Sequence, residues 1–231
     1  MSYRLGVDVG GTFTDFLLIN ESDGSTYTAK VPSTPDDSSI GVLNGVARIC
    51  EQSGVNPKDI KLVMHGTTVA TNAVLTGNGA KVGLLTTQGY ESILQVARSF
   101  CPGGLGGWVS FVKGPLLAPL ELTYGIKERT DASGEISTPL DEDHLKEQLT
   151  QLKKRGQVEA LTISFVNSYI NNTNEVLAAK IAADIFTDVP ISISSEVIPE
   201  MQEYERAETT VLNSYVRPQV SSYVSNLQSN L

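Results

Sequence analysis

A turn with two glycines near the start of the chain has the residue types of an anion-binding loop. The apolar run at residues 4–9 ends in Gly10-Gly11-Thr12, and a second apolar run begins directly after it. Glycine can adopt positive φ values and has no Cβ to block an anion, and consecutive N–H groups in such a turn can hold phosphate oxygens. Thr12 and Thr14 could add hydroxyl donors, and Asp8 could hold a hydrated Mg²⁺ ion against the phosphates.

The spacing of this turn matches neither of the common nucleotide-binding fingerprints. A Walker P-loop requires Gly-x-x-x-x-Gly-Lys-Ser/Thr followed by a helix, and a dinucleotide-binding turn requires Gly-x-Gly-x-x-Gly. Spacing alone therefore leaves two interpretations open, a phosphate-binding loop and a plain hairpin turn, because glycine turns are common in hairpins. Asp15, which follows in the same stretch, is expected to order the turn rather than to react.

A second cluster of polar residues follows a strand expected at residues 61–64. His65-Gly66-Thr67-Thr68 is expected to open a helix over residues 66–75. The N-terminus of a helix offers free N–H groups and a field that favours an anion, and ligands of α/β sheets gather at the carboxyl ends of strands. His65 is then either a ligand for substrate or phosphate or a satisfied core histidine, and Thr67 or Thr68 could simply cap the helix.

Other reactive residue types carry weaker signals. Glu203 and Arg206 lie one helical turn apart, so an ion pair within the helix is favoured, and a role in a cleft stays open. Cys50 and Cys101 are far apart, and neither has metal-ligand spacing around it. Cys101 also has no partner near it in the sequence that would support a nucleophile. His144 lies among acidic residues and is expected on a solvated face.

The elements that must position these residues begin with strands. Runs at residues 4–9, 13–19 and 25–31, separated by tight turns, predict a three-stranded antiparallel meander. Residues 35–37 carry helix start signals, apolar residues then repeat at helical spacing, and Gly54 ends this helix. Further along, strands (61–64, 81–86, 122–129, 160–166 and 189–194) alternate with helices (66–75, 89–97, 139–154, 174–186 and from 199 beyond 215). This alternation predicts a parallel sheet, so the expected fold class is mixed α/β.

Two features interrupt the alternation. Residues 101–108 form a glycine-rich loop, and the prolines after it extend an irregular segment. An irregular segment of this length inside a compact domain is usually functional or an insertion. Pro218 is expected to bend the last helix or to mark a helix junction.

The bulk composition is that of an ordinary globular protein. The 231 residues include 40% apolar and 19% charged residues, enough for a core that forms without disulfides or metals. A net charge of −9 argues against a nucleic-acid binder, which usually has a basic patch, yet it permits a nucleotide with its metal ion. No apolar run approaches the ~20 residues of a membrane span, and no signal peptide is evident, so a cytoplasmic location is expected.

Three stretches of the sequence together resemble one protein family. Residues 6–15 resemble the first phosphate motif of the actin-like ATPase and sugar-kinase superfamily, and their last five residues, Gly-Thr-Phe-Thr-Asp, resemble specifically the hydantoinase A, 5-oxoprolinase and acetone carboxylase family. Residues 65–75 with 83–87, and residues 195–200 with 203–206, also resemble this family. The three stretches stand in the family's order and span nearly the whole chain. Residues 99–108 depart from the commonest family pattern, so the resemblance does not specify the substrate.

The resemblance implies an actin-like (ribonuclease H-like) ATPase lobe. Its mixed sheet would open with the antiparallel meander and would carry an inserted irregular or α+β segment. Residues 1–98 would form the first part of the lobe with the phosphate loop, and residues 99–158 an insertion or substrate-side subdomain. Residues 159–231 would complete the lobe with a helix that leads toward a second lobe.

The resemblance also implies a chemistry, with ATP and Mg²⁺ as cofactors. The ATP γ-phosphate would phosphorylate the amide oxygen of a cyclic amide, such as a hydantoin or 5-oxoproline, and the ring would then be hydrolysed. Asp8 and His65 would be the catalytic residues and Asp8 the metal ligand. The cofactor-binding residues would be Gly10, Gly11, Thr12, Thr14, Gly66, Thr67 and Thr68.

The implied partner is a hydantoinase B-type subunit or domain, and the chain alone is expected to be inactive. Three alternatives stay open at this point. The first is an ATP-dependent ketone carboxylase subunit, the second a sensor that binds nucleotide without turnover, and the third a scaffold lobe that docks a partner. None of these interpretations involves nucleic acid or a membrane.

Overall fold

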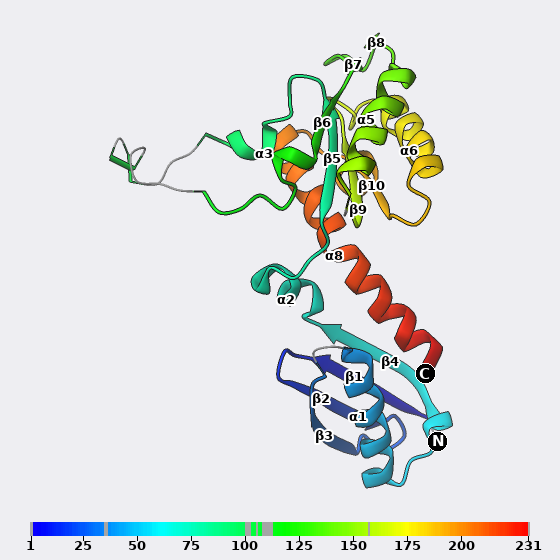
Figure 1. Ribbon diagram of the computed structural model, residues 1–231. Coiled ribbons are helices and arrows are strands. Elements are labelled where there is room, and N and C mark those ends of the chain that lie inside the picture. Colours follow the sequence, from blue (N-terminus) through cyan, green and yellow to red (C-terminus); the bar gives the residue numbers. More distant parts are fainter. Residues whose placement is uncertain are drawn as a thin grey trace. The chain divides into compact units, whose positions relative to one another are not determined.

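The chain folds into two compact units, which are described separately (Figure 1). A computed structural model describes residues 2–34, 37–99, 103–104, 106–107, 113–156 and 158–230. Unit 1 comprises Met1–Gly79 with Gln219–Leu231, and unit 2 comprises Ala80–Pro218. Unit 1 is therefore built from both ends of the sequence. The division into residues 1–98, 99–158 and 159–231 concerns the functions of these segments, and it stays a prediction.

A four-stranded mixed sheet forms the framework of unit 1. Its strands are β1 (Tyr3–Val9), β2 (Phe13–Asn20), β3 (Thr26–Pro32) and β4 (Ile60–Thr67), in the order β3-β2-β1-β4. β1, β2 and β3 pair antiparallel, and β4 pairs parallel to β1. The predicted meander is confirmed, and the parallel fourth strand makes the sheet mixed.

Helix α1 (Ser38–Ser53) covers one face of this sheet. Asp37 caps its start by accepting a bond from the Ser39 N–H at 2.9 Å, and Gly54 ends it with a left-handed backbone. Alternate strand residues such as Leu5, Phe16 and Leu18 are buried beneath it, as the period of two of a strand requires. The predicted start and end of this helix are confirmed.

Strand β4 is longer at its carboxyl end than the sequence indicates. The expected strand ended at residue 64, whereas β1 and β4 stay paired as far as Val9 and Thr67. Helix α2 therefore begins later than expected and spans Val69–Thr76, with Gly77 as its left-handed C-cap. Pairing with β1 overrides the local helix signal, because a threonine pair suits a strand as well as a helix start.

A four-stranded parallel sheet forms the framework of unit 2. Its strands are β5 (Val82–Thr87), β6 (Thr123–Ile126), β9 (Ala160–Ser164) and β10 (Ile191–Ile193), in the order β10-β9-β5-β6. All three neighbouring pairs are parallel, as the alternation of strands and helices predicts. Every residue of β5 and β9 is buried, which is typical of parallel strands covered on both faces.

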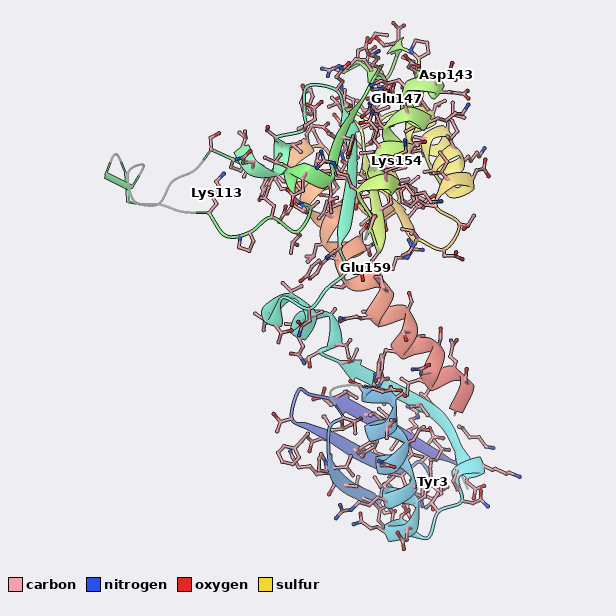
Figure 2. All side chains as sticks on the ribbon, in the orientation of Figure 1. Tyr3, Lys113, Asp143, Glu147, Lys154 and Glu159 are labelled. Carbon is pink, nitrogen blue, oxygen red and sulfur yellow. The ribbon has the colours of Figure 1, made fainter. Side chains whose placement is uncertain are left out.

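Two layers of helix cover the unit 2 sheet. Helices α5 (Glu142–Arg155) and α6 (Thr173–Ile185) bury one face together with Leu85, Leu161 and Ile163. Helix α3 (Ile93–Val96) and the unit 2 part of α8 (Glu203–Asn230) bury the other face, against Val82 and Leu84. In Figure 2 the labelled Asp143, Glu147 and Lys154 project from α5, and all three are exposed.

The remaining elements of the chain are short. A two-stranded ribbon of β7 (Arg129–Thr130) and β8 (Ile136–Thr138) stands apart from both sheets, and α7 (Ser194–Val197) directly follows β10. The 3₁₀ turns are η1 (Pro57–Asp59) and η2 (Leu120–Leu122). The single strand expected over residues 122–129 is instead two strands, β6 and β7, with a gap between them. The helix expected over residues 89–97 is reduced to the one turn of α3.

Helix α8 continues through Pro218, so the expected helix junction is absent from it. The glycine-rich loop expected at residues 101–108 falls largely outside the described residues, including Cys101. Within the described part of the chain, no helix has both the length and the apolar character needed to cross a membrane.

Candidate phosphate-binding site

The turn between β1 and β2 is braced by its own backbone and by Ser33. The Gly10 N–H donates to the Phe13 carbonyl at 3.0 Å, which closes the turn. Ser33 Oγ donates to the Gly10 carbonyl at 2.7 Å, and the Ser33 N–H donates to the Thr12 carbonyl at 2.9 Å. The Gly10 amide is thus already used within the protein and is not free for an anion, contrary to expectation.

The next two amides of the turn remain open. Gly11 and Thr12 are both exposed and lie between the strands. No acceptor for either N–H occurs among the described residues. Two adjacent free donors at a strand-to-strand turn are the minimum from which an anion-binding nest is built.

The two glycines of the turn do not use the freedom to adopt positive φ, since neither has a positive φ angle. A Cβ on Gly10 would lie 2.9 Å from the Phe13 carbonyl oxygen, which is too close for the backbone there. A Cβ on Gly11 would lie 3.3 Å from Nδ2 of Asn72, a side chain that can shift. That the missing Cβ atoms leave room for an anion stays a prediction.

The hydroxyl groups of Thr12 and Thr14 have different environments. Thr12 is exposed in the turn, so its hydroxyl can face a ligand. Thr14 is fully buried, and its Oγ1 lies 3.0 Å from Ser33 Oγ. Thr14 therefore braces the turn from inside and offers no donor to a ligand in this structure.

Asp8 is exposed near the carboxyl end of β1, opposite Asp15 on β2 and Gly66 on β4. Asp15 forms an ion pair with Lys30 at 2.9 Å across β2 and β3, so its expected role in ordering the turn between β1 and β2 stays a prediction. Asp8 has no comparable partner among the described side chains. Nowhere in the described chain do three His, Cys, Asp or Glu side chains gather to hold a metal ion. Asp8 therefore suits a hydrated Mg²⁺ carried by phosphate rather than a metal site made by protein alone.

The second polar stretch lies directly beside the turn. The N–H and the hydroxyl of Thr68 both donate to the Val9 carbonyl at 3.1 Å. Asn72 Nδ2 donates to Thr68 Oγ1 at 3.2 Å and approaches Gly11. The pairing of β1 with β4 brings together two stretches that were predicted separately, and Asn72, whose amide lies next to the open turn, was not predicted as a site residue.

His65 faces the opposite side of the sheet from Asp8. It pairs with Val7 in the register of β1 and β4, and side chains alternate between faces. Its Nε2 lies 2.6 Å from the hydroxyl of Tyr223 on α8. Partial burial lowers the pKa of His65, and the negative charge of Asp8 opposes this shift. Burial raises the pKa of Tyr223 to about 12, so the phenol keeps its proton.

The sheet face that carries Asp8 is hollowed. A cavity of about 960 Å³ lies on unit 1, and its lining includes Asp8, Asp15, Lys30, His65 and Gly66. Apolar side chains of the same face are well exposed, among them Leu17 at 41%, Leu62 at 46% and Met64 at 50%. Of the predicted site residues, Asp8, His65 and Gly66 border this concave surface, whereas the turn at residues 10–12 lies outside its lining.

Comparison with known proteins identifies the family. The sequence pattern of the hydantoinase/oxoprolinase N-terminal region matches residues 4–186. This chain belongs to the hydantoinase/oxoprolinase family. The caprolactamase alpha subunit of Pseudomonas jessenii is 36% identical over an alignment 231 positions long, which covers 98% of this chain and 33% of that protein.

Solved structures of this family share the fold. The ATP-dependent caprolactamase of Pseudomonas jessenii superposes with a TM-score of 0.86 at 35% identity, covering 98% of this chain and 33% of that one. Nucleotide-free acetone carboxylase superposes with a TM-score of 0.88 at 25% identity, covering 98% and 34%. The predicted fold class, mixed α/β with a sheet that opens on an antiparallel meander, is confirmed, and the chain shares the fold of these two enzymes. The chain spans about a third of the length of the relatives it matches.

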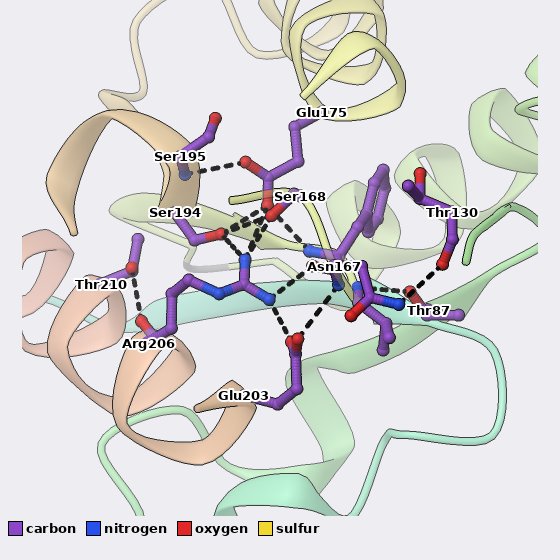
Figure 3. Close-up of polar contacts among 12 residues, drawn as sticks. Thr87, Thr130, Asn167, Ser168, Glu175, Ser194, Ser195, Glu203, Arg206 and Thr210 are labelled. Atoms are coloured by element: carbon purple, nitrogen blue, oxygen red, sulfur yellow. Dashed lines mark hydrogen bonds and ion pairs between the residues drawn. The ribbon is translucent and has the colours of Figure 1, made fainter. Parts of the chain in front are cut away.

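The third stretch that resembles the hydantoinase/oxoprolinase family lies in unit 2 and folds around a buried arginine (Figure 3). Arg206 is 1% exposed and forms the predicted ion pair with Glu203. It also donates to the Phe165 carbonyl at 2.8 Å and lies 3.8 Å from Glu175, which is fully buried. Ser168 and Ser194 accept further bonds from its guanidinium.

The network around Arg206 connects the carboxyl ends of β9 and β10, two neighbouring strands of the parallel sheet of unit 2. Glu175 accepts from the Phe165 N–H at 2.8 Å and from the Ser195 N–H at 2.9 Å, and these residues follow β9 and β10. The Asn167 N–H donates to Glu203 at 3.0 Å. A buried cation with two carboxylates and several backbone groups orders this edge of unit 2.

A second buried carboxylate lies next to the network. Glu128 is 4% exposed, accepts from Asn174 at 2.9 Å and also bonds the Thr87 hydroxyl. Burial raises the pKa of Glu128, and the nearby charge of Glu175 adds to this, although the two hydrogen bonds oppose it. Glu128 was not predicted as a buried carboxylate, because nothing in the spacing of its neighbours marks it as buried.

Proposed function

We propose that this chain supplies the phosphate-binding lobe of an ATP-dependent enzyme that hydrolyses a cyclic amide. The observation that carries the proposal is the pair of free, exposed amides of Gly11 and Thr12 close to the unpaired Asp8. Similarity to an ATP-dependent caprolactamase supports the same class of reaction. The whole protein's activity is part of the proposal, since the relatives extend well beyond the matched third.

The residues at the turn would bind and orient the terminal phosphates. The amides of Gly11 and Thr12 would donate to phosphate oxygens, with the Thr12 hydroxyl as a third donor. Asp8 would hold a Mg²⁺ ion, which neutralises charge on the phosphates when bound. Gly66, Thr67 and Thr68 would form the adjoining wall of the site.

The proposed chemistry has two stages. In the first, the substrate's amide oxygen attacks the γ-phosphorus of ATP, the bond to the β-phosphate oxygen breaks, and ADP leaves. In the second, water adds to the activated carbon, and the ring C–N bond breaks as its nitrogen takes a proton, which leaves an acyl phosphate. A second water then adds to the acyl carbon, and inorganic phosphate leaves, so that the product is a free carboxylate. Positioning and electrostatic stabilisation are the main protein contributions to the first stage.

A second candidate function is that of an ATP-dependent ketone carboxylase subunit. Similarity to acetone carboxylase over 98% of the chain favours it. The same turn would bind the same phosphates, and the substrate alone would differ. A B-type subunit is the proposed partner for either reaction, and the 231 residues alone are expected to show no ATP turnover.

The proposal is tested by titrating the chain with Mg·ATP and following backbone amide signals by NMR. We expect the Gly11 and Thr12 signals to shift, and Asp8→Ala to weaken binding by about tenfold, which corresponds to about 1.4 kcal/mol. Asp15→Ala is the matched control, because Asp15 lies on the same sheet face but pairs with Lys30. Shifts that avoid the turn, or equal weakening by both variants, would exclude a phosphate loop and favour a scaffold lobe.

A further inference from the structure

The last helix supplies a side chain to the second polar stretch of the site. Tyr223 of α8 is 5% exposed and packs in the core of unit 1. Its hydroxyl oxygen lies 2.6 Å from Nε2 of His65, and the two ring centroids are 5.4 Å apart. The two residues are 158 positions apart in the chain, so sequence spacing cannot reveal this contact.

The chemistry of the two partners favours donation from Tyr223 to His65. Burial raises the pKa of the Tyr223 phenol to about 12, so the hydroxyl keeps its proton, and a hydrogen bond with Thr67 works against this rise. The unprotonated nitrogen of a neutral imidazole is a better acceptor than a phenol oxygen, which shares its electrons with the ring. At 2.6 Å, the contact is therefore read as the Tyr223 hydroxyl donating to Nε2 of His65.

We propose that Tyr223 is a positioning residue that holds His65 as the tautomer with its proton on Nδ1. A neutral imidazole has one donor nitrogen and one acceptor nitrogen, and the partner of one nitrogen determines the role of the other. Because Nε2 accepts from Tyr223, Nδ1 carries the proton. Nδ1 has no hydrogen-bond partner in the described part of the chain, so it is the nitrogen left to donate.

This arrangement gives His65 a defined role in the candidate site. His65 borders the cavity that includes Asp8, but its side chain lies on the other sheet face, which it shares with Thr67 at the end of β4. A donor role of His65 toward an anion therefore concerns the end of β4 and not the floor of the cavity. A neutral N–H donor bonds an anion without adding a second positive charge beside a metal ion. The importance of that donor rests on the proposed function, whereas the tautomer itself depends only on the contacts within unit 1.

The tautomer is tested by ¹⁵N NMR of the histidine side chains in the 231-residue chain at neutral pH. The chain has two histidines, so His144 serves as an internal reference. We expect Nε2 of His65 to give a pyridine-type signal and Nδ1 a pyrrole-type signal. In Tyr223→Phe, which keeps the ring but lacks the hydroxyl, the two nitrogens should move toward averaged signals.

Two further variants separate the hydroxyl effect from packing. Thr67→Val removes the hydrogen bond with Tyr223 and should weaken the preference of His65 in the same direction. Tyr27→Phe changes another tyrosine packed against the same core and should leave His65 unchanged. A protonated Nε2 in the wild type, or a Tyr223→Phe spectrum identical to the wild type, would overturn the proposal.

Adding AMP-PNP with Mg²⁺ distinguishes this proposal from the proposed function. If both are right, the Nδ1 signal of His65 shifts on addition, and the shift is reduced in Tyr223→Phe but not in Tyr27→Phe. If the free protein shows the expected tautomer but the nucleotide leaves His65 and the turn unchanged, Tyr223 positions His65 and the phosphate site is refuted. A shift of the turn amides without any effect at Nδ1 would refute the role of His65 alone.

Discussion

Removing the buried arginine of unit 2 should cause a large loss of stability. Arg206→Met keeps a side chain of similar length, yet it leaves Glu175 fully buried with no cation beside it. Breaking a buried ion pair by removing one partner typically costs about 3–5 kcal/mol. That is a large share of the roughly 5–15 kcal/mol that stabilises a whole domain, so unit 2 should become marginal.

Urea unfolding followed by circular dichroism measures this loss. With a slope of about 2 kcal/mol per molar urea, the unfolding midpoint should fall by roughly 1.5–2.5 M. Arg98→Met is the matched control, because Arg98 pairs with Glu205 at the surface with 58% and 38% of the two side chains exposed. Exposed pairs contribute about 0–1 kcal/mol, so the control should shift the midpoint by less than about 0.5 M.

A second substitution checks the physical cause. Adding Glu175→Gln to Arg206→Met removes the negative charge that Arg206 no longer balances. The glutamine keeps an oxygen that can accept from the Phe165 or the Ser195 N–H group. The double variant should therefore recover about 1–2 kcal/mol relative to Arg206→Met alone. Our reasoning is refuted if Arg206→Met costs no more than Arg98→Met, or if Glu175→Gln makes the arginine variant still weaker.

Two other predictions follow from buried positions. The folded-state pKa of Glu128 lies above its ordinary value of 4.5, so its contribution to stability is present at low pH and is lost as pH rises through the folded-state pKa. The unfolding free energy of the wild type minus that of Glu128→Gln should then decrease from pH 5 to pH 8, and a rising difference would contradict this. Gly45→Ala would place a Cβ 2.0 Å from the Phe16 ring, so overpacking of about 1–3 kcal/mol should exceed the gain of about 1 kcal/mol in helix propensity. Thermal unfolding should show a lower midpoint for Gly45→Ala but not for Asn44→Ala on the exposed side of α1.

Local patterns predicted the elements of this fold well because their signals are short-range. The meander of β1–β3 and the cap pair of α1, Asp37 and Gly54, follow from alternation and turn residues within a few positions. The same rules misplaced the start of α2, since pairing between β1 and β4 decides where that strand ends. Long-range pairing is a tertiary effect that a window of neighbouring residues does not contain.

In the candidate site, too, features that depend on neighbouring residues were predicted, and features that depend on contacts between distant segments were not. The two stretches around Gly11 and Thr68 were predicted separately, and strand order brings them into contact. The ion pair of Glu203 with Arg206 follows from helical spacing, whereas Glu175 joins it from a distant helix. Asn72 and Tyr223 were missed because their contacts depend on how α2 and α8 pack.

The two-part make-up of unit 1 has a consequence for the order in which the protein can assemble. The core under its sheet includes Tyr223 and Leu227, which follow the whole of unit 2 in the sequence. During synthesis, residues 80–218 are therefore made between the two parts of unit 1, and its core can be completed only after the turns of α8 that carry Tyr223 and Leu227 have been added. Joining the two parts closes a loop as long as the whole of unit 2, and contacts so distant in sequence form late in folding.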